Sequence, residues 1–128
     1  MSDDITILGN KFSEPIGPDK LEFFVPEQTP SMVSFKTDQF TSLCPVTMQP
    51  DYSYIQIDYS PNVKLVESKS LKLYLWGFRQ KGITCEDLST TIASDLFDAL
   101  TPLSITVTVK QAMRGGLETL AVTEIESE

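Results

Sequence analysis

Hydrophobic and polar residues alternate in four stretches of the chain, as they do in β-strands that turn one face toward a core. These stretches are residues 32–37, 52–59, 103–110 and 117–123. Between the last two, Gly115 and Gly116 can adopt the positive φ angles that a tight hairpin turn needs. The pattern therefore predicts two strands, a middle segment of another kind, and a closing hairpin of two more strands.

A four-residue apolar spacing predicts a helix in the middle segment. Leucine and isoleucine occupy positions 88, 92, 96 and 100, which fall on one helical face. Thr84 and Asp87 have the spacing of a capping box at the helix start, and proline follows at position 102. The expected helix therefore begins at Thr84 and stops at Thr101-Pro102.

Residues 66–79 fit two patterns. Leu71, Leu73 and Leu75 alternate as in a strand, but Leu71 and Leu75 also share a helical face with Phe78. The periodicity alone does not decide between these structures. The length of the segment and its content of leucine, lysine, glutamate and serine favour a helix.

These elements give the order ββααββ, which predicts an α+β domain with an antiparallel sheet and two helices on one face. The chain of 128 residues is long enough for one such domain and too short for two of ordinary size. Residues 1–30 contain several prolines and glycines but show little periodicity, so we expect an irregular arm that wraps the domain. Residues 1–128 are therefore treated as a single domain.

Composition excludes several classes of function. The net charge is −8 without a basic cluster, which argues against direct binding to nucleic acid and favours a small-molecule substrate. The chain has no histidine, so histidine-ligated metal sites and Ser/His/Asp or Cys/His catalytic groups are ruled out. No glycine-rich phosphate loop of the usual kinds occurs. We expect no metal site.

The two cysteines, Cys44 and Cys85, are 41 positions apart without a CxxC pair. This spacing fits neither a disulfide-rich secreted scaffold nor a structural zinc site, so reduced thiols are expected. The N-terminus lacks the basic start and apolar run of a signal peptide, and no apolar stretch has the length of a membrane span. The sequence therefore predicts a soluble cytoplasmic protein without a membrane partner.

Cys44 lies between the first two strands, in the polar, proline-bracketed segment 40–51, and precedes Asp51 by seven positions. A thiol in a loop near a carboxyl group is an arrangement that covalent catalysis uses, because the thiolate attacks and the product needs a proton. A free cysteine is more often a small buried hydrophobic residue. From these residues alone, that second interpretation of Cys44 is the better supported.

Further acidic and thiol groups are predicted at the starts of the two helices. Glu67 begins the first, and Cys85 with Glu86 lies in the first turn of the second. The helix dipole at an N-terminus favours an ionised Glu86 and would draw Cys85 toward the thiolate form. Glu86 is equally explained as a first-turn charge that stabilises its helix.

Five blocks of the sequence resemble a known enzyme family. The blocks are Phe40–Pro45, Gln49–Asp51, Glu67–Tyr74 (ESKSLKLY), Glu86–Asp87 and Arg114–Gly116. In this order and spacing they are similar to the NADPH-dependent 7-cyano-7-deazaguanine reductases, and the resemblance covers most of the chain. It implies the tunnelling fold, whose ββααββ order agrees with the elements predicted above and makes the ambiguous segment a helix.

The resemblance implies a nitrile reduction in queuosine biosynthesis, a tRNA modification pathway. Cys44 would add to the nitrile carbon of 7-cyano-7-deazaguanine as a covalent thioimide, and Asp51 would deliver a proton to nitrogen. Two NADPH molecules would then supply the hydrides that give the aminomethyl product. Such an adduct divides one difficult reduction into easier steps. The substrate is the free base, so no direct contact with nucleic acid is implied.

The resemblance also implies the binding residues. Substrate contacts fall on Val66, Glu67 and Ser68, and on Cys85 and Glu86, whose carboxylate suits adjacent N–H donors of a guanine-like ring. NADPH contacts fall on Ser68, Lys69, Arg114 and Gly115, where the two cations suit phosphate groups. For Lys72, a solvated position on the helix surface is at least as good an explanation.

Position 85 departs from the family pattern, because this chain has cysteine where the family has histidine. A thiol shuttles protons and donates hydrogen bonds poorly near neutral pH, so the substitution either is tolerated or impairs hydride transfer. If both cysteines line one pocket, a disulfide between Cys44 and Cys85 could form under oxidation.

The resemblance implies a homodecamer of two stacked pentamers, with ligands at the seams between subunits. Two other functions stay open. One is an amidine-forming transferase that passes the same thioimide to an amine, although its members lack the ESKSLK-type motif that is intact here. The other is a non-catalytic purine- or pterin-binding module, which would need Glu86 but leaves Cys44 and Asp51 unexplained.

Overall fold

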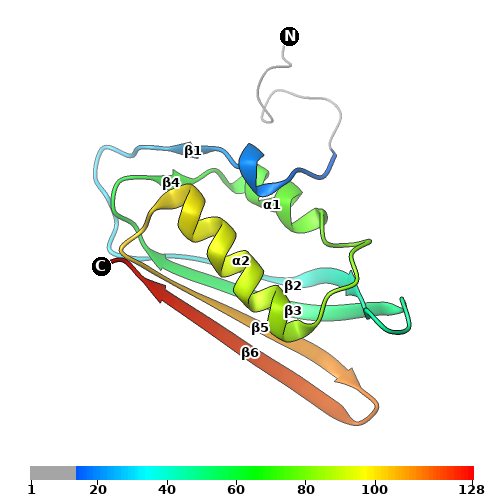
Figure 1. Ribbon diagram of the computed structural model, residues 1–128. Coiled ribbons are helices and arrows are strands. Elements are labelled where there is room, and N and C mark those ends of the chain that lie inside the picture. Colours follow the sequence, from blue (N-terminus) through cyan, green and yellow to red (C-terminus); the bar gives the residue numbers. More distant parts are fainter. Residues whose placement is uncertain (1–13) are drawn as a thin grey trace.

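The computed structural model describes residues 14–128, and Figure 1 shows their arrangement. After a short 3-10 helix (Pro18–Lys20), the elements are β1 (Phe23–Phe24), β2 (Val33–Leu43), β3 (Pro50–Ser60), β4 (Leu65–Val66), α1 (Ser68–Trp76), α2 (Cys85–Leu100), β5 (Ser104–Arg114) and β6 (Leu117–Glu126). The long elements follow the predicted order ββααββ. The short strands β1 and β4 were not predicted.

Strands β2, β3, β5 and β6 form an antiparallel sheet in the order β2-β3-β5-β6. Both helices lie over one face of this sheet, and α2 packs on β5 and β6 (Figure 1). Core-facing residues of the strands, such as Ile57 and Val107, meet Leu88, Ile92 and Leu96 of α2 in one buried cluster. Burial of these apolar side chains is the main source of stability. The predicted α+β architecture is confirmed.

The ambiguous segment is a helix, but a shorter one than residues 66–79. Helix α1 is confined to Ser68–Trp76 and buries Leu71, Leu73 and Tyr74. The helical interpretation is therefore confirmed for its centre, whereas Val66 lies in β4 instead of the helix. Val66 is held in the strand by pairing with Phe23 of β1.

The N-terminal arm is more regular than predicted. Of the predicted arm, residues 1–13 lie outside the described part, and residues 14–30 contain the 3-10 helix and β1. Pairing of β1 with β4 lays this segment beside the start of α1, where the Glu22 carbonyl accepts a hydrogen bond from Glu67 N–H at 2.9 Å. A two-residue strand is too short to show a hydrophobic periodicity, so β1 cannot be predicted from its own residues and is recognised only by its pairing with β4.

Two β-bulges change which side chains face the helices. In β2, Thr37 lies opposite Ile55 and Phe40 opposite Ser53, so β2 contains one extra residue. The extra residue reverses the alternation and keeps Phe40 on the core face. A second bulge in β5, between Gln111 and Arg114, acts in the same way. Both bulges lie near the end of the sheet where the predicted catalytic residues meet.

The hairpin between β5 and β6 forms as predicted. Gly115 and Gly116 have φ angles of 60° and 85°, which glycine adopts without steric cost. The final strand continues to Glu126, three residues beyond the predicted end. In residues 14–128, no helix has both the length and the apolar character needed to cross a membrane.

Candidate active site

The core face of the sheet changes from apolar to polar toward one end. In β3 and β5, Ile55 lies opposite Val109, and the next core-facing pair is Ser53 opposite Gln111. Asp51 lies two residues before Ser53, nearer the end of the sheet and on the same face of β3, and it is also buried. A buried polar end on an otherwise apolar face is unusual in a protein core and typical of a binding site.

Cys44 follows β2 directly and begins the turn that leads to β3. Its backbone N–H donates to the Gln49 carbonyl at 2.9 Å, and its own carbonyl accepts from Met48 N–H at 2.8 Å. Met48 adopts a φ of 58°, in the left-handed region that closes such turns. These bonds fix the backbone on both sides of the thiol, whose residue is 5% exposed.

Hydrogen bonds within this turn lower the pKa of the Cys44 thiol from 9.0 to about 7. The Thr47 side chain makes the largest contribution, followed by backbone groups of Thr47 and Val46, while burial acts in the opposite direction. The positive charge of Arg114 gives a smaller lowering. Near neutral pH a large fraction of Cys44 is therefore thiolate, which is the nucleophilic form.

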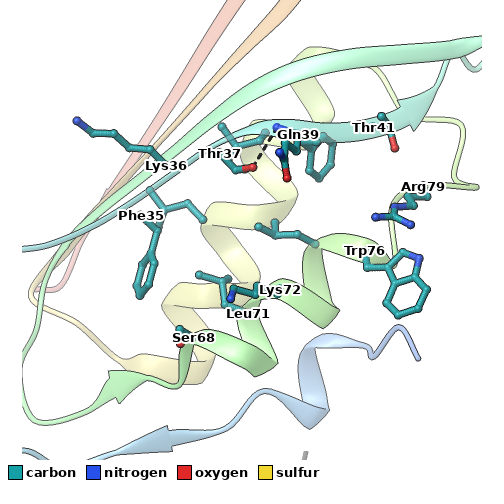
Figure 2. A pocket seen from close by; sticks show the side chains of 14 residues that line it. Phe35, Lys36, Thr37, Gln39, Thr41, Ser68, Leu71, Lys72, Trp76 and Arg79 are labelled. Atoms are coloured by element: carbon teal, nitrogen blue, oxygen red, sulfur yellow. Dashed lines mark hydrogen bonds between the residues drawn. The ribbon is translucent and has the colours of Figure 1, made fainter. Parts of the chain in front are cut away.

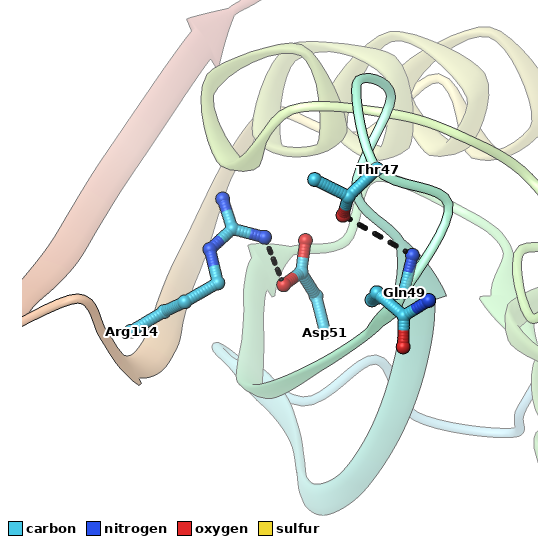
Figure 3. A network of polar contacts seen from close by, with 4 residues as sticks. All are labelled: Thr47, Gln49, Asp51 and Arg114. Atoms are coloured by element: carbon cyan, nitrogen blue, oxygen red, sulfur yellow. Dashed lines mark hydrogen bonds and ion pairs between the residues drawn. The ribbon is translucent and has the colours of Figure 1, made fainter.

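Asp51 lies in β3, where it pairs with Ser42, and not in the loop as the sequence predicted. The loop prediction was wrong because ladder pairing extends through Leu43 and Pro50 and shortens the turn. Figure 3 shows the Asp51 carboxylate facing Arg114, whose Nη1 donates to Oδ1 at 2.5 Å. The β5 bulge directs Arg114 to this face of the sheet.

Cys85 is the first residue of α2, but its thiol does not lean toward the thiolate form as predicted. Burial raises the pKa of Cys85, and the neighbouring Glu86 charge raises it further. The thiol donates to the carbonyls of Val109 at 3.5 Å and Thr119 at 3.8 Å. It therefore faces the sheet backbone and is a poor nucleophile.

Glu86 lies in the first turn of α2 and is exposed. The helix begins as predicted, because the Thr84 hydroxyl accepts a hydrogen bond from Asp87 N–H at 3.1 Å. Within residues 14–128, the Glu86 carboxylate has no side-chain partner, so it can accept hydrogen bonds from a ligand.

Val66, Glu67 and Ser68 lie at the other end of the sheet. The Val66 N–H donates to the Tyr59 hydroxyl at 3.0 Å, and Tyr59 is the last but one residue of β3, whereas Asp51 is the second. These two positions are eight residue steps apart along the strand, which corresponds to roughly 25 Å. One chain therefore does not bring both sets of predicted substrate residues to a single small ligand.

The Glu67 side chain has a structural role in this chain. Its Oε2 accepts from Lys69 N–H at 2.9 Å and its Oε1 from Ser70 N–H at 2.8 Å, so both oxygens cap α1. Lys69 thus lies at the Val66 end, while Gly115 lies beside Arg114 at the Asp51 end. The predicted cofactor residues are divided between the two ends in the same way.

A cavity of about 450 Å³ lies between β2 and α1, and Figure 2 shows its lining. Its floor is apolar, and Lys72 and Arg79 bring positive charges to it together with the Ser68 hydroxyl, whereas the Lys36 side chain extends away from it (Figure 2). Lys72 is exposed and lines this cavity, so a ligand-binding role and a solvated position on the helix both stay open for it. Cys44, Asp51 and Glu86 are not among its lining residues.

Sequence reasoning missed the buried polar residues Ser42, Ser53 and Gln111. They are 2%, 5% and 9% exposed, and no side-chain partner of theirs lies within residues 14–128. The signal was available for Gln111, because the alternation that buries Val107 and Val109 also turns position 111 to the core. For Ser42, the β2 bulge reversed the alternation and hid the signal.

Both thiols are free and buried. The two cysteines lie at the same end of the sheet, but Cys85 is bonded to strand carbonyls, which gives it little freedom to approach Cys44. A disulfide formed by oxidation stays a prediction. Two free thiols after treatment of the folded chain with oxidant would exclude it.

Comparison with known proteins gives consistent matches. The family model described as QueF-like protein matches residues 50–128. A protein of Staphylococcus saprophyticus named NADPH-dependent 7-cyano-7-deazaguanine reductase is 46% identical over 120 residues, which covers 90% of this chain and 72% of that protein. The protein of that name from Staphylococcus haemolyticus is also 46% identical, and the match covers 89% of this chain and 72% of that protein.

A solved structure of similar fold supports the same placement. The archaeosine synthase QueF-Like, crystallised in the apo form, superposes with a TM-score of 0.72 at 27% sequence identity. The match covers 76% of this chain and 95% of the archaeosine synthase chain. The tunnelling-type α+β fold expected from the sequence is therefore confirmed.

Proposed function

Because the chain belongs to the QueF-like protein family, we propose that it reduces the nitrile of 7-cyano-7-deazaguanine to an aminomethyl group with NADPH. The relatives that are 46% identical are named NADPH-dependent 7-cyano-7-deazaguanine reductases, and we assign the reaction to queuosine biosynthesis. The observation that carries the proposal is the Cys44 turn, which holds a thiol with a pKa of about 7 at the polar end of the sheet.

Cys44 is the nucleophile in this proposal. Its sulfur forms a bond to the nitrile carbon, and one electron pair of the triple bond moves to nitrogen, which gives a thioimide once nitrogen takes a proton. The Thr47 hydrogen bond and the Arg114 charge, which lower the pKa of Cys44, keep the attacking form populated at neutral pH. Cys85 cannot take this role, because its pKa is raised and its thiol faces the sheet.

Asp51 is the proton carrier. It is 5% exposed at the same end of the sheet, so water competes little for its oxygens. Its contact with Arg114 orients the carboxyl group across β3 and β5. To deliver a proton to the imine nitrogen, Asp51 first takes one up from solvent and exchanges part of its contact with Arg114 for the substrate.

Two further sets of side chains suit binding of the substrate and of NADPH. The exposed Glu86 carboxylate offers two acceptor oxygens to the adjacent N–H groups of a guanine-like ring. NADPH supplies the hydrides when it is bound, and the cations Lys72 and Arg79 at the β2–α1 cavity fit its phosphate groups. Ser68 lines that cavity, and Lys69 adjoins it in sequence, which supports two of the cofactor positions expected from the sequence.

The complete site belongs to a homo-oligomer. Asp51 and Tyr59, the strand residue that Val66 contacts, lie roughly 25 Å apart along β3, so the two sets of residues reach one ligand only if neighbouring chains supply them. Strands β2 and β6 are the two edges of the sheet and are long enough to pair between copies. A ring closed in this way, stacked as a decamer of two pentamers, leaves no edge unpaired.

The proposed enzyme acts in the cytoplasm on the free base and not on tRNA. A net charge of −8 disfavours a polyanionic substrate, and the nucleophile requires a reduced thiol. Small-molecule binding needs neither a basic surface nor contact with a membrane.

One experiment tests the proposal. The purified chain is mixed with 7-cyano-7-deazaguanine, and intact mass is recorded before and after NADPH is added, with NADPH absorbance followed in parallel. We expect a mass increase equal to the mass of one 7-cyano-7-deazaguanine molecule. The adduct should be lost on reduction, with two NADPH oxidised per nitrile. Cys44→Ala should form no adduct, and Cys85→Ala serves as the matched thiol control. An adduct on Cys44→Ala would remove Cys44 from the reaction.

The amidine-forming alternative is supported by one observation, the structural similarity to an archaeosine synthase. The sequence identity is 27% to that protein and 46% to the reductases, which favours reduction. An adduct that forms but resists NADPH, and that an amine releases as an amidine, would support this alternative. Absence of any adduct would instead support a non-catalytic binding module.

A further inference from the structure

Three polar side chains at the Cys44 end of the sheet are buried without partners. Ser42, Ser53 and Gln111 are 2%, 5% and 9% exposed, and within residues 14–128 none of their side chains makes a hydrogen bond. Leaving such groups unpaired costs free energy, so folded proteins almost always satisfy them. Several unpaired groups at one place therefore point to a ligand that completes them.

Their positions place them beside the proposed reaction centre. Ser53 lies two residues from Asp51 on the same face of β3, and Gln111 lies directly opposite Ser53 on β5. Ser42 is the ladder partner of Asp51 on β2. The unpaired groups thus flank the Asp51 carboxyl on three neighbouring positions of the sheet.

The neighbouring groups at this end cannot take the same role. The Cys85 thiol already donates to the carbonyls of Val109 and Thr119. Arg114, whose Nη1 is engaged with Asp51, offers donors only, and Glu86 is a carboxylate that offers acceptors only. Gln111 is the largest of the unpaired groups, and its carboxamide has two N–H donors and one acceptor oxygen. A lactam ring, which presents a carbonyl oxygen next to an N–H, requires both kinds.

From this geometry we infer that Gln111 is a substrate-binding residue that recognises the lactam edge of a deazapurine, with Ser53 as its neighbour on the site wall. This inference rests on the proposed function and extends its substrate site to strand β5. Gln111 donates to the ring carbonyl, which the Glu86 carboxylate cannot do, so the two side chains divide donor and acceptor roles between them. Gln111 thereby takes over polar recognition that the Cys85 thiol cannot provide.

The test measures reversible binding in a background that cannot form the adduct. Affinity for 7-cyano-7-deazaguanine is determined by calorimetry for Cys44→Ala and for Cys44→Ala combined with Gln111→Leu. We expect the second substitution to weaken binding about tenfold or more, because it leaves the ring carbonyl without a donor. The melting temperature should stay the same or rise, since leucine removes an unpaired polar group from the core.

Matched variants separate recognition from packing. Gln111→Met has a side chain of similar length without hydrogen bonds, so it should lose affinity as leucine does, and it replaces leucine if that variant fails to fold. Thr108→Val lies on the same strand with its side chain on the opposite face and should leave affinity unchanged. In the Cys44-containing chain, the loss should appear in KM more than in kcat.

The outcomes separate the role of Gln111 from the proposed function. Unchanged affinity in both Gln111 variants, with the Cys44→Ala chain still binding the nitrile, overturns the role of Gln111 and leaves the proposed function standing. If the Cys44→Ala chain binds no 7-cyano-7-deazaguanine at all and the Cys44-containing chain forms no adduct, the proposed function itself is lost.

Discussion

Arg114 at the end of β5 donates a hydrogen bond to Asp51 near the start of β3, at 2.5 Å, across the paired strands. The same guanidinium also lowers the pKa of Cys44. One cation thus acts on both groups that the proposed chemistry uses. The β5 bulge makes this possible, because without the extra residue the side chain at position 114 would alternate to the opposite face.

Removal of the Thr47 hydroxyl should make Cys44 less reactive at neutral pH. The Thr47 side chain is the largest cause of the lowered Cys44 pKa, so Thr47→Val should move that pKa from about 7 toward 9.0. The rate of alkylation by iodoacetamide rises with pH as thiolate forms, and its midpoint should shift upward accordingly. Thr47→Ser keeps the hydroxyl and should retain the lower midpoint. An unshifted midpoint in Thr47→Val would show that the hydroxyl does not stabilise the thiolate.

Substitution of Arg114 should affect the thiol as well as the proposed cofactor binding. In Arg114→Gln the positive charge near Cys44 is lost, so the alkylation midpoint should rise, but by less than in Thr47→Val because the charge is a smaller cause. KM for NADPH should also rise if Arg114 contacts a cofactor phosphate. Arg79→Gln, at the β2–α1 cavity, is the comparison that changes KM without changing the thiol. A larger thiol shift in Arg114→Gln than in Thr47→Val would contradict this ranking.

The two cysteines should differ sharply in reactivity although both are buried. The pKa of Cys44 is lowered and that of Cys85 is raised, so near pH 7.5 the folded chain should take up one alkyl group at Cys44 before Cys85 reacts. Peptide mapping by mass spectrometry identifies the site, and alkylation of the denatured chain gives the control in which both react. Equal rates in the folded chain would mean that the turn does not activate Cys44.

Two inactive variants should complement each other if neighbouring chains share a site. Cys44→Ala removes the nucleophile. Glu67→Gln changes the expected substrate contact at the other end of the sheet while keeping an oxygen for the α1 cap. In a ring assembled at random from equal amounts, about a quarter of the sites receive both intact residues, so about that share of activity should return. Activity is followed by NADPH oxidation after subunit exchange. No recovery in rings shown to be mixed would place the whole site within one chain.

The contact between the two helices should contribute measurably to stability. The Tyr74 hydroxyl donates to Asp95 Oδ2 at 2.5 Å, and Tyr74 is 2% exposed, so Tyr74→Phe leaves the carboxylate without this donor. Hydrogen bonds to charged groups contribute about 1.5–3 kcal/mol, and urea unfolding should show a loss of that order. Tyr52→Phe, at a residue that is 60% exposed, is the matched control and should change stability little. A loss below the error of the urea titration would exclude a stabilising role for this bond.

Local pattern was sufficient for most of the fold. The alternation in residues 103–110, the glycine pair at 115–116 and the Thr84 cap each depend on residues close in sequence, and the structure contains each of them. The predicted boundaries of some elements were wrong. Helix α1 begins later than predicted because Val66 pairs with Phe23, a partner distant in sequence. Strand pairing likewise extended β2 and β3 and took Asp51 out of the loop.

The sequence by itself determined the ββααββ order and the absence of histidine chemistry, and its resemblance to a known family pointed to Cys44 as the candidate nucleophile. Only the tertiary structure decided which thiol is activated, because Thr47 lowers the pKa of one cysteine and burial raises that of the other. It also decided that Val66 lies far from Asp51, and that Gln111 faces the proposed reaction centre. The reason is physical: hydrophobic periodicity and capping act over a few residues, whereas burial, charge contacts and bulges depend on segments that meet only when the chain folds.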